Sequence, residues 1–346
     1  MVYTKAALIM SALRSFFVAL IPKVARRYFK DLLESLRRHN PGPQLGSAKH
    51  SLIPTQIYPV GTNFYKVLNS ATREKFSGLG LTPATAVASI GTCFAEEFAY
   101  FMRGRGYNYV TTEKDVLTAS ANWGRVYTVP NLLQIVSYSA EPSYPVFLEK
   151  TDQGWFDPLR EAGASYSPSR EAAHAAVLEH RRASREAFGQ CDVLIITVGQ
   201  NEAWTDRATG QVWATLPPQT ILRARKEDFS VSEFSFEENV IALTQVVSTL
   251  QKINPAVKIV FTVSPVASYA SFSDIDVVSQ SFANKCLLRA AVNNVVASQP
   301  GKIFYFPSFE MVLCYNPFNF RADNRHVKYA AVDRIFSVLS KSTLLR

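Results

Sequence analysis

Short apolar runs alternate with longer amphipathic segments along most of the chain. The runs are bounded by glycine, proline or charged residues, which predicts buried strands at Ala86–Ile90, Tyr107–Thr111, Asp192–Val198, Lys258–Val263 and Ile303–Phe306. Helical spacing of apolar residues predicts helices at Cys93–Arg103, Pro130–Tyr138, Arg170–Phe188, Phe236–Ile253, Gln280–Ser298 and Val327–Lys341. Wholly apolar strands that alternate with helices predict an α/β fold, with a parallel sheet covered by helices on both faces.

The N-terminal part of the chain follows a different pattern. Residues 4–38 have the character of a helix, with an apolar stretch, Ala6–Ile21, that is interrupted by Arg14. This stretch is shorter than the about 20 apolar residues of a bilayer span, and no small-residue cleavage site follows it. A second segment, rich in proline and glycine, predicts a linker. The expected organisation is a basic amphipathic helical arm at 1–40, a linker at 41–61 and a folded domain at 62–346.

The net charge of +9 belongs almost entirely to the arm. Residues 1–50 hold nine lysine and arginine side chains against two acidic ones, so the rest of the chain is nearly neutral. A nearly neutral domain is not expected to bind nucleic acid. In the arm, basic residues alternate with aromatic and leucine side chains. This suits a helix lying on a membrane surface, or a helix packed on a protein with its basic face solvated.

Cysteine and histidine usage narrows the chemistry. The four cysteines are scattered and form no C-x-x-C pair, so neither a disulfide framework nor a cysteine zinc site is expected, and a reducing compartment fits. We expect a cytoplasmic location, with peripheral membrane contact through residues 1–40. His174 and His180 lie in a charged helix, which predicts a solvated face rather than a metal site. No glycine-rich phosphate loop is present, so no nucleotide, other cofactor or metal is expected.

Polar clusters follow two predicted strands and precede the last predicted helix. Gly91 allows a sharp turn that puts Thr92 at a helix N-terminus, where free N–H groups stabilise an oxyanion. Asn201 adds an amide donor after another strand. Asp323 stands three residues before His326, a spacing at which a carboxylate can hold the imidazole in one tautomer while its far nitrogen acts as a base. Because ligands bind at the carboxyl ends of parallel strands, these clusters are candidates for one site.

These residues also carry a family resemblance. The segment SIGTCFAEEF, at 89–98, resembles the signature of the GSCFA family, whose members are similar to SGNH (GDSL-like) hydrolases. Other segments resemble family segments in the expected order, over roughly residues 60–340. They are Asn122–Tyr127, Phe156–Pro158, Thr197–Gly199, Glu202–Trp204, Asn254-Pro255, Thr262–Val266, Lys285, Leu288–Ala290, Phe306–Glu310 and the Asp323/His326 pair.

The resemblance implies a three-layer, flavodoxin-like (SGNH-hydrolase-like) fold and ester chemistry by a hydroxyl, a histidine and a carboxylate. Carried over, Thr92 takes the position of the nucleophile, His326 that of the base and Asp323 that of its partner. The oxyanion hole and the substrate contacts are then expected from the Thr92 N–H and from Gly124, Asn201, Glu202 and Trp204.

The chain departs from the family signature at the nucleophile, where threonine replaces serine. Threonine keeps the hydroxyl, but its methyl group restricts χ1 and crowds the reacting atom. Thr92 is therefore either a nucleophile or a helix N-cap with impaired catalysis. Its neighbour Cys93 is either a rival nucleophile or buried packing. Four further residues are either structural or in contact with a ligand: Trp123, Trp204, Glu202 and Lys285.

The predicted function is that of an SGNH-like esterase or O-acyl(acetyl)transferase that acts on an acylated carbohydrate. The carbohydrate follows from analogy at the level of the fold. The alternative is a catalytically impaired glycan-binding or scaffolding protein, docked at a membrane-associated assembly by its basic arm.

Overall fold

The computed structural model describes residues 58, 63–114, 116, 118–141, 143–161, 165–315 and 319–341. The chain divides into two compact units, Met1–Ala71 and Thr72–Arg346, and the second contains the sheet. The predicted arm and, apart from Tyr58, the predicted linker lie outside the described residues. Within the described ranges, no helix is long and apolar enough to cross a membrane.

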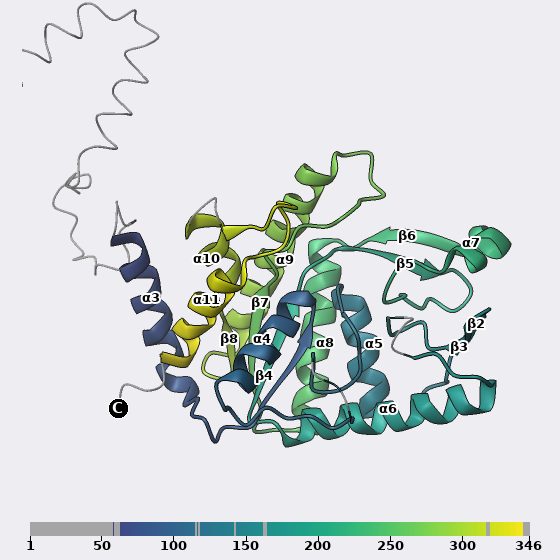
Figure 1. Cartoon of the computed structure of the whole chain (residues 1–346), viewed down its shortest axis with the longest axis horizontal. Helices are drawn as coiled ribbons and strands as arrows, with labels where there is room; N and C mark the ends of the chain where they lie inside the picture. Colours follow the sequence, from purple (N-terminus) through teal and green to yellow (C-terminus); the bar gives the residue numbers. More distant parts are fainter. Residues whose placement is uncertain are drawn as a thin grey trace, which may run out of the picture. The chain divides into compact units, whose positions relative to one another are not determined.

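A four-stranded parallel sheet forms the centre of the second unit (Figure 1). Its strands, in spatial order, are β1 (Val87–Gly91), β4 (Val193–Val198), β7 (Lys258–Val263) and β8 (Ile303–Tyr305). All residues of β1 and β4 are buried, as expected for strands that are covered on both faces. The predicted parallel α/β architecture is confirmed.

The predicted strand at Tyr107–Thr111 is reduced to a single bridge. Tyr109 pairs in parallel with Val87, and the backbone N–H of Val110 donates to the Val87 carbonyl at 2.9 Å. Since β4 occupies the other edge of β1, the Tyr109 segment extends the sheet outward. The resulting spatial order is the 2-1-3-4-5 order of flavodoxin-like folds.

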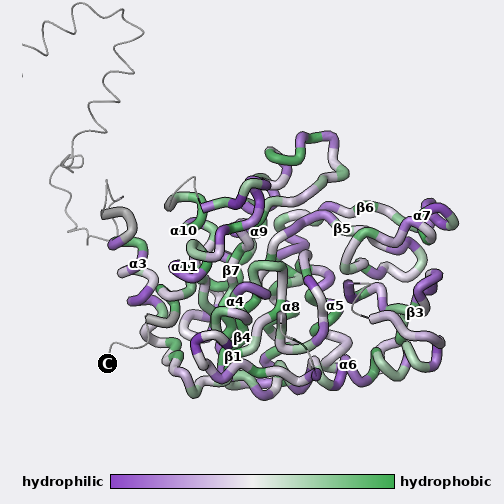
Figure 2. The backbone as a smooth tube through the Cα atoms, in the orientation of Figure 1, coloured by the Kyte–Doolittle hydropathy of each residue, from purple (hydrophilic) through white to green (hydrophobic). Residues whose placement is uncertain are grey.

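Helices cover both faces of the sheet (Figure 1). One face carries α5 (Val129–Ala140), α6 (Arg170–Gln190), α8 (Phe236–Ile253) and α9 (Val277–Ser298), and the other carries α4 (Cys93–Gly104), α10 (Ser308–Tyr315) and α11 (Tyr329–Lys341). Ile196 and Phe261 of the strands share one core with Leu243 of α8 and Leu288 of α9. On the opposite face, Phe336 of α11 packs on three rings of α4 at centroid distances of 5.0 to 5.6 Å. Hydrophobic residues accordingly concentrate around the central strands (Figure 2).

Two hairpins and several short elements were not predicted from the sequence. The hairpins are β2 (Glu149–Thr151) with β3 (Gly154–Phe156), and β5 (Glu202–Asp206) with β6 (Phe229–Glu233). The other elements are α3 (Asn63–Phe76), η2 (Ser77–Leu79), α7 (Gln219–Arg225), η4 (Lys226–Asp228) and α10. A small separate core of Phe156, Trp213, Ile221 and Phe229 joins the hairpins to α7. β5 begins at Glu202, shortly after β4 ends at Val198, and this short connection keeps it beside the carboxyl edge of the large sheet.

The prediction of a solvated His180 is wrong. His180 falls on the buried stripe of α6 with Ala173 and Val177, and its Nδ1 lies 2.8 Å from Oε2 of Glu113. Burial lowers the pKa of this imidazole. The helix is charged overall, but one of its faces packs on the domain, and only His174 remains exposed.

Candidate active site

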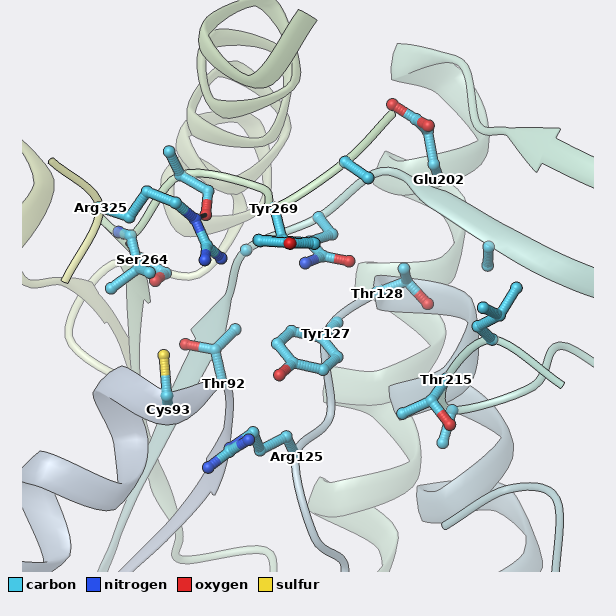
Figure 3. Close-up of a pocket in the computed structure, with 18 of the residues that line it drawn as sticks. Thr92, Cys93, Arg125, Tyr127, Thr128, Glu202, Thr215, Ser264, Tyr269 and Arg325 are labelled. Carbon is cyan, nitrogen blue, oxygen red and sulfur yellow. Dashed lines mark hydrogen bonds between the residues drawn. The ribbon is translucent and has the colours of Figure 1, made fainter. Parts of the chain in front are cut away.

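The carboxyl ends of β1, β4 and β7 open on a cavity of about 350 Å³ (Figure 3). Residues that directly follow these strands line it, together with residues of the loop before α5, of β5, of the loop after β7, of α9 and of the turn before α11. They include Thr92, Cys93, Arg125, Tyr127, Gly199, Glu202, Trp204, Ser264, Tyr269, Phe272, Lys285, Arg325 and His326. Ligands bind at this edge in parallel α/β sheets, so the cavity is the candidate active site.

Thr92 occupies the sharp turn between β1 and α4. Its side-chain hydroxyl accepts the backbone N–H of Phe94 at 3.2 Å and so caps the helix. The turn depends on Gly91, which has a φ of 144°, because a Cβ there would lie 2.2 Å from the carbonyl oxygen of Thr197. Thr92 is 2% exposed, and it lines the cavity.

Gly199 brings three cavity side chains together at the end of β4. A Cβ at this position would lie 2.6 Å from Cγ2 of Thr92, 3.1 Å from Cβ of Ser264 and 3.6 Å from Nζ of Lys285. The methyl group that distinguishes threonine from serine is therefore packed directly against this glycine. Any side chain at position 199 would displace it.

The turn before α11 orients His326. Nδ1 of His326 lies 2.5 Å from Oδ2 of Asp323, and Oδ1 of the same carboxylate accepts the backbone N–H groups of His326 and Arg325, each at 3.0 Å. Asn324 makes the turn tight, with a φ of 55°. The hydrogen bond with His326 holds the pKa of the Asp323 carboxyl well below its usual range. This arrangement leaves Nε2 as the imidazole nitrogen not bonded to Asp323, on a ring that lines the cavity.

Of the three groups expected to form the oxyanion hole, two are hydrogen-bonded elsewhere and two do not line the cavity. The backbone N–H of Thr92 donates to the carbonyl of Thr197 at 3.3 Å. The amide of Asn201 donates to the carbonyl of Phe234 at 2.7 Å, and neither Asn201 nor Gly124 lines the cavity. Cys93, the first residue of α4, has an N–H with no acceptor within its own helix, and it stands next to Thr92.

Glu202 and Trp204 both line the cavity, in different roles. The Glu202 carboxylate accepts the hydroxyl of Ser271 at 2.9 Å, the backbone N–H of Phe272 at 2.8 Å and the amide of Asn284 at 3.3 Å. It therefore fixes the loop after β7 and points away from Thr92 (Figure 3). The Trp204 ring meets that of Phe272 edge to face at a centroid distance of 5.3 Å and forms part of the cavity wall.

Trp123 does not reach the cavity. It is fully buried, its Nε1 donates to the hydroxyl of Ser184 at 2.8 Å, and its ring stacks on Phe188. Of the two interpretations that the sequence left open, the structural one holds for this residue.

Sequence reasoning left Lys285 undecided and missed Arg125, Tyr269 and Arg325. Lys285 reaches the cavity from α9 with 3% exposure, and its ammonium group donates to the carbonyl of Gly199. Burial lowers the pKa of Lys285 to about 7, and Arg325 acts in the same direction. Arg325 lies inside the Asp-x-x-His turn, and Arg125 lies in the segment Asn122–Tyr127, so their positions within these motifs were the available signal.

Cys93 lines the cavity beside Thr92, and it also lies against a small hollow together with His326. Burial raises the pKa of its thiol, and the neighbouring carboxylate of Glu96 adds to this effect. A raised pKa keeps the thiol protonated at neutral pH, which disfavours Cys93 as a nucleophile.

The fold and the site together define a parallel α/β protein with a cavity, lined by charged, polar and aromatic side chains, at the carboxyl edge of its sheet. The family model for the GSCFA family matches residues 86–338, and the chain belongs to this family. The match spans the sheet and all the cavity residues named above. No match is found among the curated proteins.

Three solved structures show a partial likeness. A Clostridium thermocellum family 3 carbohydrate esterase has 10% identity and a TM-score of 0.34, over 75% of this chain and 98% of that one. An acetyl xylan esterase (Est2A) from the rumen bacterium Butyrivibrio proteoclasticus has 12% identity and a TM-score of 0.32, over 75% and 64%. A Corynascus thermopiles (Myceliophthora fergusii) carbohydrate esterase family 2 enzyme with a carbohydrate binding domain has 15% identity and a TM-score of 0.29, over 76% and 67%.

Proposed function

We propose that the protein is an SGNH-type esterase or O-acyltransferase, with threonine as the nucleophile, that acts on an acylated carbohydrate. One observation supports the proposal most. Thr92 and His326 stand at opposite ends of the domain sequence and line the same cavity, and the imidazole bears a carboxylate partner on Nδ1. A hydroxyl, an imidazole and a carboxylate in this relation are the groups that acyl transfer requires.

In the proposed reaction, Nε2 of His326 takes the hydroxyl proton of Thr92 as Oγ1 attacks the ester carbonyl. The tetrahedral intermediate collapses with cleavage of the bond between the acyl carbon and the sugar oxygen, and His326 returns its proton to that oxygen. Water or a second sugar hydroxyl then attacks the acyl-threonine, with His326 again acting first as base and then as acid. Asp323 stabilises the imidazolium in both steps.

The hydrogen-bond donor that we propose for the oxyanion is the N–H of Cys93 at the start of α4. This group stands next to the nucleophile, has no intrahelical acceptor and lies at the positive end of a helix. We propose it in place of the donors expected from the sequence, since Asn201 and the N–H of Thr92 are bonded elsewhere.

The cavity wall suits a sugar ring. Tyr127, Trp204, Tyr269 and Phe272 present aromatic surface beside polar and charged side chains. Aromatic faces pack on the apolar C–H faces of sugars, while neighbouring polar groups bind the hydroxyls. This composition supports a carbohydrate as the substrate, which was expected from analogy at the level of the fold.

The proposal is tested by hydrolysis of p-nitrophenyl acetate and of an acetylated oligosaccharide by the wild type, Thr92→Ser, Thr92→Ala and Cys93→Ala. We expect Thr92→Ala to lose at least about 10³-fold in kcat/KM, because the nucleophile is removed. Cys93→Ala is expected to keep most of the activity, because it removes the thiol and leaves the N–H. A donor with a labelled acetyl group and an unacetylated sugar as acceptor distinguish the two activities. A hydrolase releases the label as acetate, and a transferase moves it to the added sugar.

A second candidate function has one observation in its favour. The Thr92 hydroxyl is already engaged as a helix cap, and its methyl group is packed on Gly199. Both features suit a glycan-binding protein that has lost catalysis. The binding function is supported if the wild type and Thr92→Ala are equally inert while Thr92→Ser gains activity.

A further inference from the structure

The charged groups of the cavity are unevenly matched. Arg125, Lys285 and Arg325 line it together with the imidazole of His326, and the carboxylate in its lining is Glu202. Glu202 is occupied by three hydrogen bonds to the loop after β7 and to α9. The cavity therefore carries an excess of positive charge toward anything that enters it.

The two arginines differ in their partners. Arg125 is neutralised from outside the cavity, with Nε 3.1 Å from Glu96 and a second contact of 3.7 Å to Glu161. No carboxylate in the described part of the chain forms an ion pair with the guanidinium of Arg325. Its Nε donates to the carbonyl of Ala267 at 3.1 Å, and its guanidinium carbon lies over the Tyr269 ring, 5.1 Å from the ring centroid.

Arg325 is held in a fixed relation to the catalytic candidate His326. Oδ1 of Asp323 accepts the backbone N–H of both residues, so one carboxylate sets the turn from which both side chains enter the cavity. With Nε tied to Ala267, the terminal nitrogens of Arg325 are directed into the cavity (Figure 3). A guanidinium that is fixed in this way is prepared for bidentate recognition of a carboxylate or a phosphate.

Lys285 adds to the positive charge of the cavity, which it lines from α9. It is 3% exposed and bonded to a neutral carbonyl, and the positive charge of Arg325 adds to the effect of burial in lowering its pKa. Two cations that destabilise each other gain from an anion placed between them.

We propose that Arg325, supported by Lys285, forms a subsite for an anionic group of the substrate, next to the sugar hydroxyl that carries the acyl group. The substrate class is then an acylated acidic glycan, whose charge is a uronic acid carboxylate or a phosphate. This inference rests on the proposed function for its place in the reaction, and on the charges of the cavity for the ligand.

Binding is tested first, without turnover, by titration calorimetry of the full chain with glucuronate, glucose 6-phosphate and glucose. We expect the wild type to bind at least one anionic sugar about tenfold or more tighter than glucose, and the stronger of the two identifies the source of the charge. Arg325→Gln is expected to abolish this preference and Arg325→Lys to retain part of it. Arg223→Gln, at an exposed arginine of α7, is the matched control and is expected to change nothing.

Turnover is compared next, on acetylated galacturonan and acetylated xylan oligosaccharides. Equal binding of glucose and both anionic sugars by the wild type, or an anion preference that survives Arg325→Gln, overturns the subsite. If Arg325→Gln does not fold, the subsite is tested on the wild type by the salt dependence of binding. Added salt must weaken the binding of the anionic sugar and leave the binding of glucose unchanged. Anion-selective binding without hydrolysis of either ester retains the subsite and rejects the esterase. Equal kcat/KM on both esters retains the esterase and rejects the subsite.

Discussion

Asp323 and His326 are joined by two hydrogen bonds, which are accepted by different oxygens of one carboxylate. Oδ2 lies 2.5 Å from the imidazole Nδ1, and Oδ1 accepts the backbone N–H of His326 at 3.0 Å. The first bond fixes the tautomer of the ring and the second fixes the turn that carries it. Because both side chains are more than one third exposed, the pair adds little to stability, and its value lies in orientation.

Asp323→Asn is therefore expected to impair catalysis far more than folding. An asparagine amide can donate to Nδ1 and hold the opposite tautomer, which removes the basic nitrogen from the cavity side. We expect kcat/KM on an acetyl ester to fall by about 10³–10⁴-fold, with little change in the free energy of unfolding. Steady-state kinetics and urea denaturation measure the two effects. A variant that keeps more than a tenth of the activity would show that the pair does not orient a base.

The central sheet was predictable because its strands are apolar on both faces. β7 has the predicted bounds, and β4 differs from its prediction by one residue, since an unbroken apolar run between turn residues admits few alternatives. The hairpin β5–β6 escaped prediction because its residues are half-exposed. Its stability comes from contacts such as that between Trp204 and Phe229, which no local pattern reveals.

Local pattern indicated the candidate site only where a residue directly follows a strand or lies on a tight turn, whereas Glu202 and Trp204 of β5 were expected from the family resemblance. Thr92 and His326 meet at one cavity for that reason. Asn201 also follows a strand, but its amide oxygen accepts a hydrogen bond from Asn239, 38 positions later in α8. Long-range contacts of this kind decide which way a side chain points. They also explain why Arg325 was passed over, although it lies inside the motif.

The basic arm is expected to bind acidic membranes. Residues 1–40 combine basic and aromatic side chains, and such segments bind anionic lipid surfaces through charge and partial burial of the aromatic groups. The full chain should sediment with phosphatidylserine-containing vesicles and not with phosphatidylcholine vesicles. A chain that starts at residue 41 should remain in the supernatant. Equal sedimentation of the two chains would assign the arm to protein packing instead.

Glu202 is expected to act through the loop that it holds. Glu202→Ala removes the acceptor for Ser271 and Phe272, so the wall beside Trp204 loses its anchor. We expect KM to rise several-fold with little change in kcat, because a loosened wall weakens the ground state and the transition state alike. Limited proteolysis should cut faster within residues 267–276. Glu227→Ala, at an exposed residue of η4 outside the cavity lining, serves as the control and should alter neither measurement.

Gly199 and Thr92 are expected to show strong coupling in a double-mutant cycle. Gly199→Ala places a methyl group 2.6 Å from Cγ2 of Thr92, and this overpacking should cost about 1–3 kcal/mol in the free energy of unfolding. In a Thr92→Ser background the obstructing methyl group is absent, so most of this cost should disappear. Gly189→Ala, whose new Cβ would have a single neighbour at 4.0 Å, should be close to neutral in both backgrounds. Additive effects at positions 92 and 199 would contradict the packing of threonine against the glycine.

Lys285 is expected to make the domain more stable as the pH rises from 7 to 9. Its pKa is about 7 in the folded state against an ordinary value of 10.5, so between these values the unfolded chain binds one proton more than the folded chain. The free energy of unfolding then increases with pH, by at most about 1.4 kcal/mol per unit for one proton. Lys285→Met removes this slope and should exceed the wild type in stability below pH 7, where the wild type must bury a charged ammonium group. Lys252→Met, at an exposed position of α8, should retain the wild-type slope. Urea denaturation of the three proteins at half-unit intervals gives the slopes, and identical profiles would mean that the Lys285 ammonium stays protonated over this range.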